Sequence, residues 1–197
     1  VLLGNGLSQA RRHEDALSVQ GAELSMARRL GAAEEDILMV HGNLAMTYRA
    51  LGRLEEAIRT RREVYSGWLK LKGEEHYDTL REANNLAALL NGLERYQEVK
   101  SLMCKMLPVA RRVAGDNDEV TLRMKWTYAD VLYKDDAATL DDVREAVTIY
   151  EETERIARRV FGCSHPTAEE IGDDLRDARA ALAAREVEAL RVGAMRV

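Results

Sequence analysis

Three groups of side chains recur at a similar spacing along the chain, and their chemistry suits the binding of an extended peptide. Asparagine offers a donor and an acceptor together, arginine can hold a carboxylate through two hydrogen bonds, and tryptophan can anchor an apolar side chain. The candidate binding residues are Met39, Asn43, Met46, Arg49, Arg81, Asn84, Asn91, Arg123, Trp126, Asp130 and Lys134. Within this set, Arg81 and Arg123 are the pair expected to hold an acidic partner.

Each of these residues also has an ordinary structural interpretation. Arginine and asparagine on an exposed helix face are commonly solvated, while the two methionines and the tryptophan could belong to the core. The binding interpretation is favoured for the set because its members occupy corresponding positions of a repeat. Trp126 corresponds to Gly42 and Asn84, so we predict that its indole is exposed on a concave face and not enclosed by a helix pair.

The repeat that positions these residues has a period of 42 residues. The segment beginning "LAMTYRALGRLEEAI" at Leu44 aligns with "LAALLNGLERYQEV" at Leu86, 42 residues later. Gly31, Gly73 and Gly115 follow the same period, and Gly162 comes 47 residues after Gly115. A fixed period of this length indicates stacked repeats. The five extra residues are expected in a longer loop around 134–142, whose sequence is rich in turn and N-cap residues.

Each repeat is predicted to contain two helices, because apolar residues recur at intervals of three and four. Small Ala45, Ala87 and Ala129 are expected to let the two helices pack closely, and the recurrent glycines are expected to end helices. The predicted helices span about 13–30, 34–51, 54–72, 76–92, 95–114, 118–134, 140–161 and 166–192. The fold class that follows is all-α, a right-handed helical-repeat solenoid of antiparallel helix pairs.

The run "NLAMTYRALGRLEEAI" at 43–58 resembles a tetratricopeptide repeat. The "NNLA" at 84–87 and "FGCSHPT" at 161–167 resemble the longer repeat variant of kinesin light chains. This resemblance spans nearly the whole chain and implies one solenoid over 1–197 that is a fragment of a longer array. Its parts would be a partial first repeat (1–30), repeats at 31–72, 73–114 and 115–161, and a C-terminal partial repeat with a capping helix (162–197).

Catalytic and cofactor-binding signatures are not found in the sequence. There is no glycine-rich phosphate loop, no nucleophile elbow and no His-Glu-x-x-His helix, and Cys104 and Cys163 lack partners at zinc-ligand spacing. His76 and His165 follow repeat-ending glycines by three residues, where Glu34 and Asp118 also fall, so we expect helix capping and not catalysis. We therefore predict a protein that is not an enzyme and that uses no cofactor or metal.

The balance of charges bears on the class of partner. The net charge is −5 with 46% hydrophobic residues, which argues against nucleic acid because that affinity rests on clustered Lys and Arg. No apolar run approaches the length of a membrane span. The predicted partner is a protein or peptide, and the predicted setting is intracellular and cytoplasmic; an organelle stays open because the chain begins with Val1.

Two functions remain open at this point. The first is an adaptor that binds a peptide or protein in its concave groove, and the second is a structural or scaffold subunit of a larger assembly. A groove binder should be soluble and monomeric by itself, whereas a permanent subunit should expose large apolar patches.

Overall fold

The computed structural model describes residues 12–194, and within this range the chain forms α-helices and no strand. The helices are α2 His13–Arg29, α3 Glu34–Ala50, α4 Leu54–Lys72, α5 Tyr77–Asn91, α6 Tyr96–Val113, α7 Glu119–Lys134, α8 Leu140–Phe161 and α9 Pro166–Ala194. The all-α helical-repeat fold class predicted from the sequence is therefore confirmed. The "VLLGNGL" segment, assigned above to the partial first repeat, lies outside the described residues.

Helix ends form where the sequence signals them. Gly73, Gly115 and Gly162 have φ of 85°, 89° and 96°, a left-handed conformation that costs glycine little and that commonly ends a helix. At the following helix starts, the Nδ1 atoms of His76 and His165 accept hydrogen bonds from the backbone N–H groups of residues 78 and 167. The capping role expected of these two histidines is confirmed.

Two further helix starts complete this comparison. The Asp118 carboxylate accepts from the N–H of Val120 at 2.8 Å, as the repeat predicts. Glu34 is instead the first residue of α3, and its N-cap, Ala33, makes no side-chain bond. Of the four residues that follow a repeat-ending glycine by three positions, Glu34 is therefore the one that does not cap a helix.

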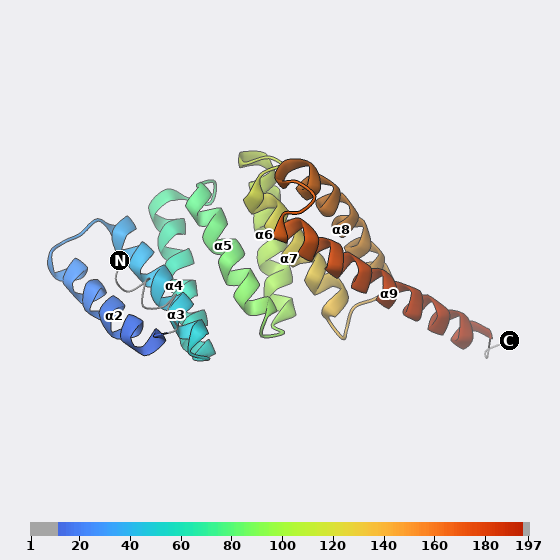
Figure 1. The fold of residues 1–197 in the computed structure, drawn as a ribbon, viewed down its shortest axis with the longest axis horizontal. Coiled ribbons are helices and arrows are strands. Elements are labelled where there is room, and N and C mark those ends of the chain that lie inside the picture. The colour runs from blue at the N-terminus through green and yellow to red at the C-terminus, as the bar shows by residue number, and fades with distance from the viewer. Residues whose placement is uncertain (1–11, 195–197) are drawn as a thin grey trace. The chain divides into compact units, whose positions relative to one another are not determined.

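The chain divides into two compact units, residues 1–89 and 90–197, which we call unit 1 and unit 2. In unit 1, α3 packs against both α2 and α4, in the antiparallel succession visible in Figure 1. Leu38 of α3 forms a small cluster with Val64 and Trp68 of α4. Gly67 permits this close approach, because an added methyl group would collide with the Leu38 side chain.

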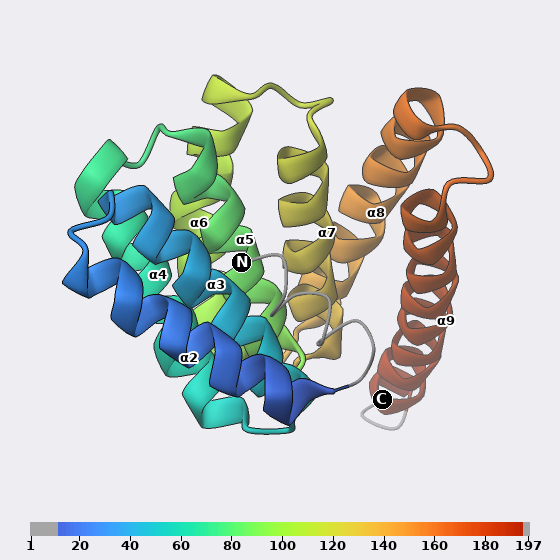
Figure 2. The ribbon, with the colours of Figure 1, turned by 60° about the vertical axis from the view of Figure 1, so that its left-hand side comes forward.

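Unit 2 contains α6 to α9, together with the last two residues of α5. Its helices pack as α6 on α7, α7 on α8 and α8 on α9, and the last three run side by side in Figure 2. α9 also contacts α7, and it supplies Ala168, Ile171, Leu175 and Ala178 to the main core cluster. The last helix is thus an integral part of the core of unit 2.

Close helix packing depends on the recurrent small residues. Ala45, Ala87 and Ala129 are at most 1% exposed, as are Ala57, Val99 and Ala146 at corresponding positions of the second helices. Their burial confirms that the recurrent alanines lie on the inner side of each helix pair.

The extra residues of the fourth repeat lie between α7 and α8, as predicted. Thr139 and Asp142 form a reciprocal capping box at the start of α8. The buried Asp135 carboxylate accepts hydrogen bonds from Gln97 at 2.9 Å and Lys100 at 3.3 Å. These contacts with α6 fix the loop, since a carboxylate removed from water needs such partners.

None of the helices described between residues 12 and 194 combines the length and the hydropathy needed to cross a bilayer.

Candidate peptide-binding site

The site starts from one side of α3 that carries exposed side chains. Met39 and Met46 are 47% and 62% exposed, and Asn43 lies between them, half-buried. Spacings of four and three residues bring these side chains onto one face of the helix. The opposite face carries Leu38 and Leu44 into the core, so α3 is held firmly while its methionines meet solvent.

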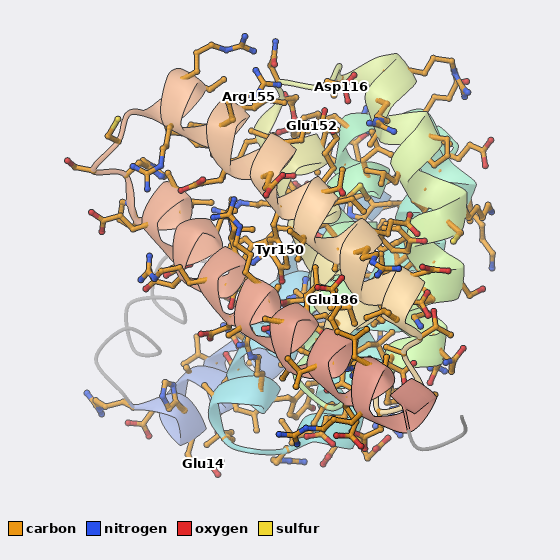
Figure 3. The ribbon with its side chains drawn as sticks, turned by 90° about the vertical axis from the view of Figure 1, so that its right-hand side faces the viewer. Glu14, Asp116, Tyr150, Glu152, Arg155 and Glu186 are labelled. Atoms are coloured by element: carbon orange, nitrogen blue, oxygen red, sulfur yellow. The ribbon has the colours of Figure 1, made fainter. Side chains whose placement is uncertain are left out.

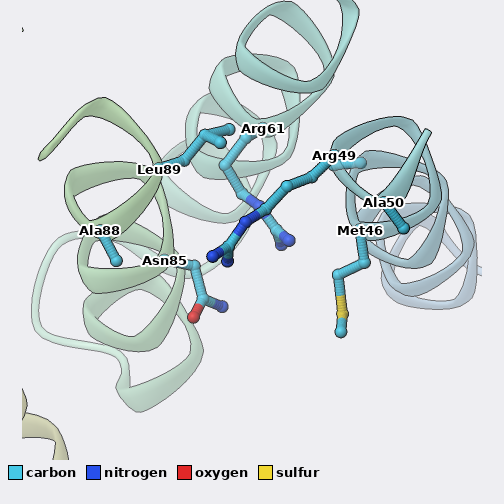
Figure 4. Close-up of a pocket in the computed structure, with 8 residues that line it drawn as sticks. Met46, Arg49, Ala50, Arg61, Asn85, Ala88 and Leu89 are labelled. Carbon is cyan, nitrogen blue, oxygen red and sulfur yellow. The ribbon is translucent and has the colours of Figure 1, made fainter. Parts of the chain in front are cut away.

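A pocket of about 400 Å³ adjoins this face in unit 1 (Figure 4). It lies between α3 and α5, with one residue from α4. Its lining residues are Ala45, Met46, Arg49, Ala50, Arg61, Asn85, Ala88 and Leu89. The pocket therefore combines small and apolar side chains with two guanidinium groups and one amide, a composition typical of ligand sites.

Arg61 forms one wall of the pocket, and this position was not predicted. Arg61 is absent from the candidate residues chosen from the sequence; it is 7% exposed, and its Nη1 lies 2.8 Å from Oε2 of Glu82 on α5. Gly42 lies against this guanidinium, since a methyl group added there would be 3.6 Å from that nitrogen, an ordinary van der Waals contact. The signal was present in the sequence, since Arg61 falls four residues after Ala57 and three before Val64, on the buried stripe of α4.

Glu82 organises the polar groups around Arg61. Its Oε1 accepts from the Asn85 amide at 3.2 Å and lies 3.5 Å from Nε of Arg81. The buried carboxylate and guanidinium thus compensate each other, which a buried ion pair requires. Their mutual fixation sets the orientation of Asn85 and Arg61 in the pocket.

Arg49 brings a second positive charge to the pocket. It is exposed, and among residues 12–194 no carboxylate pairs with it. Figure 4 shows that Arg49 and Arg61 extend from different helices into the space that Asn85 also faces. Because Glu82 offsets only one of the two guanidinium charges, the pocket favours an anionic group.

The two arginines first expected to hold a carboxylate have local partners. Arg81 is 46% exposed and pairs with Asp78 at 2.8 Å, and Arg123 is 43% exposed and pairs with Glu119 at 2.8 Å. Both side chains face solvent as expected. Their role in binding stays a prediction, and exposed pairs of this kind contribute little to stability.

Apart from Arg123, the candidate residues of unit 2 take part in an internal network. Asp130 is 8% exposed and accepts hydrogen bonds from the Asn91 amide at 2.8 Å, from Lys134 Nζ at 2.5 Å and from the Tyr150 hydroxyl at 2.6 Å. Figure 3 locates Tyr150 between α8 and α9. Three donors satisfy a buried carboxylate, so the structure gives Asp130 a structural role.

Trp126 is not exposed as its repeat position suggested. Its indole is half-buried against the main cluster of unit 2, and Nε1 donates to Oδ2 of Asp174 at 2.6 Å. The reason is Asp174 of α9, 48 residues later in the chain, since the side chain that the next helix supplies is not given by the repeat position. Asn84 is likewise buried, at 8% exposure, and its Oδ1 has no partner among the described residues.

Burial and neighbouring charges shift the titration of this network. Burial, reinforced by Asp130, raises the pKa of Asp174, although the indole N–H opposes the shift. For Lys134, burial acts to lower the pKa, but the hydrogen bond and charge of Asp130 outweigh it and the net shift is upward. Burial also raises the pKa of Tyr150. The network therefore holds a charged lysine between two carboxylates.

Within the described part of the chain, no group of three or more His, Cys, Asp or Glu side chains could hold a metal ion. The buried Lys125 of α7 pairs with Asp116 at 2.9 Å and Glu152 at 3.0 Å, which lie at the same end of unit 2 in Figure 3. These contacts are those of a structural ion-pair cluster.

Comparisons with known proteins agree with this architecture. A family model for the tetratricopeptide repeat matches residues 36–112. Among solved structures, BtubC (BKLC) from P. vanneervenii is similar with a TM-score of 0.69 at 17% identity, over 97% of this chain and 79% of that one. A crystal structure of nearly identical TPR-like repeats, from a kinesin light chain candidate of Podosopora anserina, gives a TM-score of 0.68 at 18% identity, over 99% of this chain and 94% of that one. A search of curated proteins gave no match.

Proposed function

Residues 36–112 of this chain belong to the tetratricopeptide repeat family, and from this premise we propose that the protein binds a partner peptide in the pocket between α3 and α5. Repeats of this family generally mediate contacts between proteins and are typically not enzymes. The observation that carries the proposal is Arg49, which pairs with no carboxylate of the described residues and lies beside the fixed guanidinium of Arg61, at the edge of the exposed methionines of α3.

The chemistry of the pocket defines the peptide. An Asp or Glu side chain, or a terminal carboxylate, would bind Arg49 and the free nitrogens of Arg61. A neighbouring apolar side chain would rest on Met46, since a flexible thioether adapts to many shapes. Ala88, which offers no bulk on α5, leaves room for the peptide backbone to approach.

Selection from a random 12-residue peptide display library tests this function. The wild-type chain serves as bait, and Arg49→Glu serves as counter-bait. We expect enriched sequences in which an acidic residue lies within a few positions of an apolar one, and we expect the Arg49→Glu bait to lose them. Peptides retained equally by both baits, or no enrichment, would contradict the proposal.

The second candidate function, a permanent subunit of a larger assembly, has one observation in its favour. The C-terminal part of α9 projects beyond α8 (Figure 1) and exposes Val187 and Leu190 at 50% and 75%. If this segment is an attachment surface, the isolated chain should self-associate, and the double change to serine should restore a monomer. A wild-type chain that is monomeric in light scattering would remove this candidate.

A cytoplasmic location is part of the proposal. Cys104 and Cys163 are both exposed and unpaired with each other, and exposed free thiols persist best where the surroundings are reducing. Fluorescence microscopy of the tagged full-length protein tests this location, and a signal confined to an organelle would contradict it.

A further inference from the structure

The exposed face of α3 carries an opposite charge at each end. Asp36 lies in the first turn of the helix and Arg49 in the last, and Met39, Asn43 and Met46 lie between them at spacings of three and four residues. Such spacings place neighbouring side chains on one side of a helix. Both charged side chains are exposed, and neither forms an ion pair within the described part of the chain. This face is therefore acidic at its start, apolar in its middle and basic at its end.

Asp36 is the acidic group that adjoins the methionines and keeps its charge available. The preceding carboxylate, Glu35, pairs with Lys72 of α4. Acidic residues in the first turn of a helix stabilise it through the helix dipole whichever way they point. This role is shared with Glu34, so it does not distinguish Asp36. What distinguishes Asp36 is its place three residues before the exposed Met39, where a ligand lying on that side chain would meet the carboxylate.

An amide in the middle of the face suits the backbone of a peptide. Asn43 is half-buried, and its backbone carbonyl accepts from the Thr47 hydroxyl at 3.2 Å. Its side-chain amide makes no hydrogen bond to any residue that the structure describes. An amide offers both donors and an acceptor, so Asn43 can pair with the N–H and the C=O of an extended chain. The occupant that fits this face is therefore a peptide that crosses it from one charge to the other.

The geometry of the helix gives the distance between the two charged positions. Asp36 and Arg49 are 13 residues apart, which is about 20 Å along the axis at about 1.5 Å per residue. Side chains of a helix lean toward its N-terminus, so the long side chain of Arg49 brings the two charges closer together than this. An extended peptide advances about 3.3 Å per residue. Peptide residues about four to six positions apart therefore match the two charges.

From this arrangement we propose that the peptide carries charges of both signs in a fixed order. Its acidic group binds Arg49 and Arg61, and a Lys or Arg about four to six residues away binds Asp36. The apolar side chains between them lie on Met39 and Met46. This inference rests on the proposed function and adds to it the direction of the peptide, because the opposite direction would bring like charges together at both ends.

Selection from the same peptide display library tests the basic position separately from the acidic one. The wild-type bait should enrich a Lys or Arg about four to six positions from the acidic residue, always on the same side of it. An Asp36→Lys bait should keep the acidic and apolar positions and lose the basic one. Enrichment of the acidic and apolar positions without the basic one would overturn this inference and leave the proposed function standing.

A charge exchange tests whether Asp36 is the contact. One selected peptide, labelled with fluorescein, is titrated with the wild-type and Asp36→Lys chains, and the titrations are repeated with its basic residue changed to Glu. Each single change should weaken binding about threefold to tenfold at low salt, because it replaces an attraction by a repulsion. The two changes together should restore Kd to within about twofold of the original value. Two changes that weaken binding without any recovery when combined would contradict the assigned contact.

Glu34→Lys is the matched control, because it makes the same change of charge in the same turn of α3. Glu34 is exposed, but residues two positions apart do not face each other on a helix, so this variant should leave Kd within about twofold. If Glu34→Lys weakened binding as much as Asp36→Lys, the effect would come from net charge, and the assignment of the basic residue to Asp36 would be overturned.

Discussion

Units 1 and 2 use corresponding repeat positions in opposite ways. In unit 1, the Arg61 guanidinium lies beside Gly42, and the adjoining pocket is open to solvent. In unit 2, the corresponding position holds Trp126, whose indole packs inward and donates to Asp174. The same helix face is therefore available to a partner in one unit and used for internal packing in the other.

The difference shows that corresponding positions of the repeats share a place in the backbone, but that their side chains need not share exposure or partners. Met46 is 62% exposed, whereas Asp130, in the same column, is 8% exposed and accepts three hydrogen bonds. What changes between the units is the next helix in space. α9 contacts α7 and turns a potential binding face into an interior one.

Removal of α9 should produce the largest difference in stability between the two units. A chain ending at Gly162 loses Ile171 and Leu175 from the core of unit 2, each contributing roughly 1.5–3 kcal/mol by burial. We expect the helices of unit 2 to melt far below the parent temperature, as followed by circular dichroism and hydrogen exchange. Exchange protection of α3 and α4 should persist. A truncated chain that melts as the parent does would show that α9 is not part of the core.

Arg61→Met tests the internal ion pair of unit 1. Loss of this guanidinium leaves the buried Glu82 without its closest cation, and breaking such a pair costs about 3–5 kcal/mol. The matched change Arg59→Met removes an exposed arginine of the same helix and should leave the free energy of unfolding nearly unchanged in urea titrations. Equal effects of the two substitutions on the free energy of unfolding would contradict the buried ion pair between Arg61 and Glu82.

Trp126→Ala and Met46→Ala compare the two units directly. Deletion of the half-buried indole should cost about 2–3 kcal/mol, somewhat below the range for a fully buried aromatic. Deletion of the exposed Met46 side chain should cost less than about 0.5 kcal/mol. Thermal or urea unfolding measures both, and a Trp126→Ala chain as stable as Met46→Ala would support the exposed position that the repeat first suggested.

Asp174→Asn should have the smallest effect, and its sign depends on pH. The pKa of Asp174 is raised in the folded chain, so its contribution to stability is fully present below the unfolded pKa and is lost as pH rises through the folded pKa. An asparagine oxygen can still accept from Trp126 but carries no charge. The variant should melt slightly above wild type at pH 7, and the difference should vanish below about pH 4. A variant less stable at pH 7 would contradict this.

The helices could be predicted from the sequence because their signals are local. Apolar periodicity, glycine at helix ends and the capping histidines all act within a few residues, and the predicted bounds agree with the structure to within two residues. The use of individual side chains could not be predicted in the same way. Trp126 depends on Asp174, 48 residues away, so its position follows from tertiary packing. For Arg61, the spacing within α4 indicates burial, but its partner Glu82 on α5 follows only from the packing of the two helices.

The peptide pocket shows the same limit. Met46 and Arg49 were expected to bind a partner, and both line the pocket. Arg61 and Asn85 were missed because their orientation is set by the buried Glu82. Glu82 follows the exposed Arg81, so its burial cannot be inferred from the sequence unless the pairing with Arg61 of α4 is already known.

The most direct test of this account compares three charge reversals against one fluorescent peptide obtained by selection on the wild-type chain. Fluorescence anisotropy at low salt should show that Arg49→Glu weakens binding about tenfold or more, since an arginine–carboxylate contact becomes a repulsion. Arg123→Glu in unit 2 and Arg59→Glu on the far side of α4 should leave Kd within about twofold, as expected for exposed charges that do not contact the peptide. If Arg123→Glu weakened binding as much as Arg49→Glu, the peptide would contact both units, and the assignment of unit 2 to internal packing would be wrong.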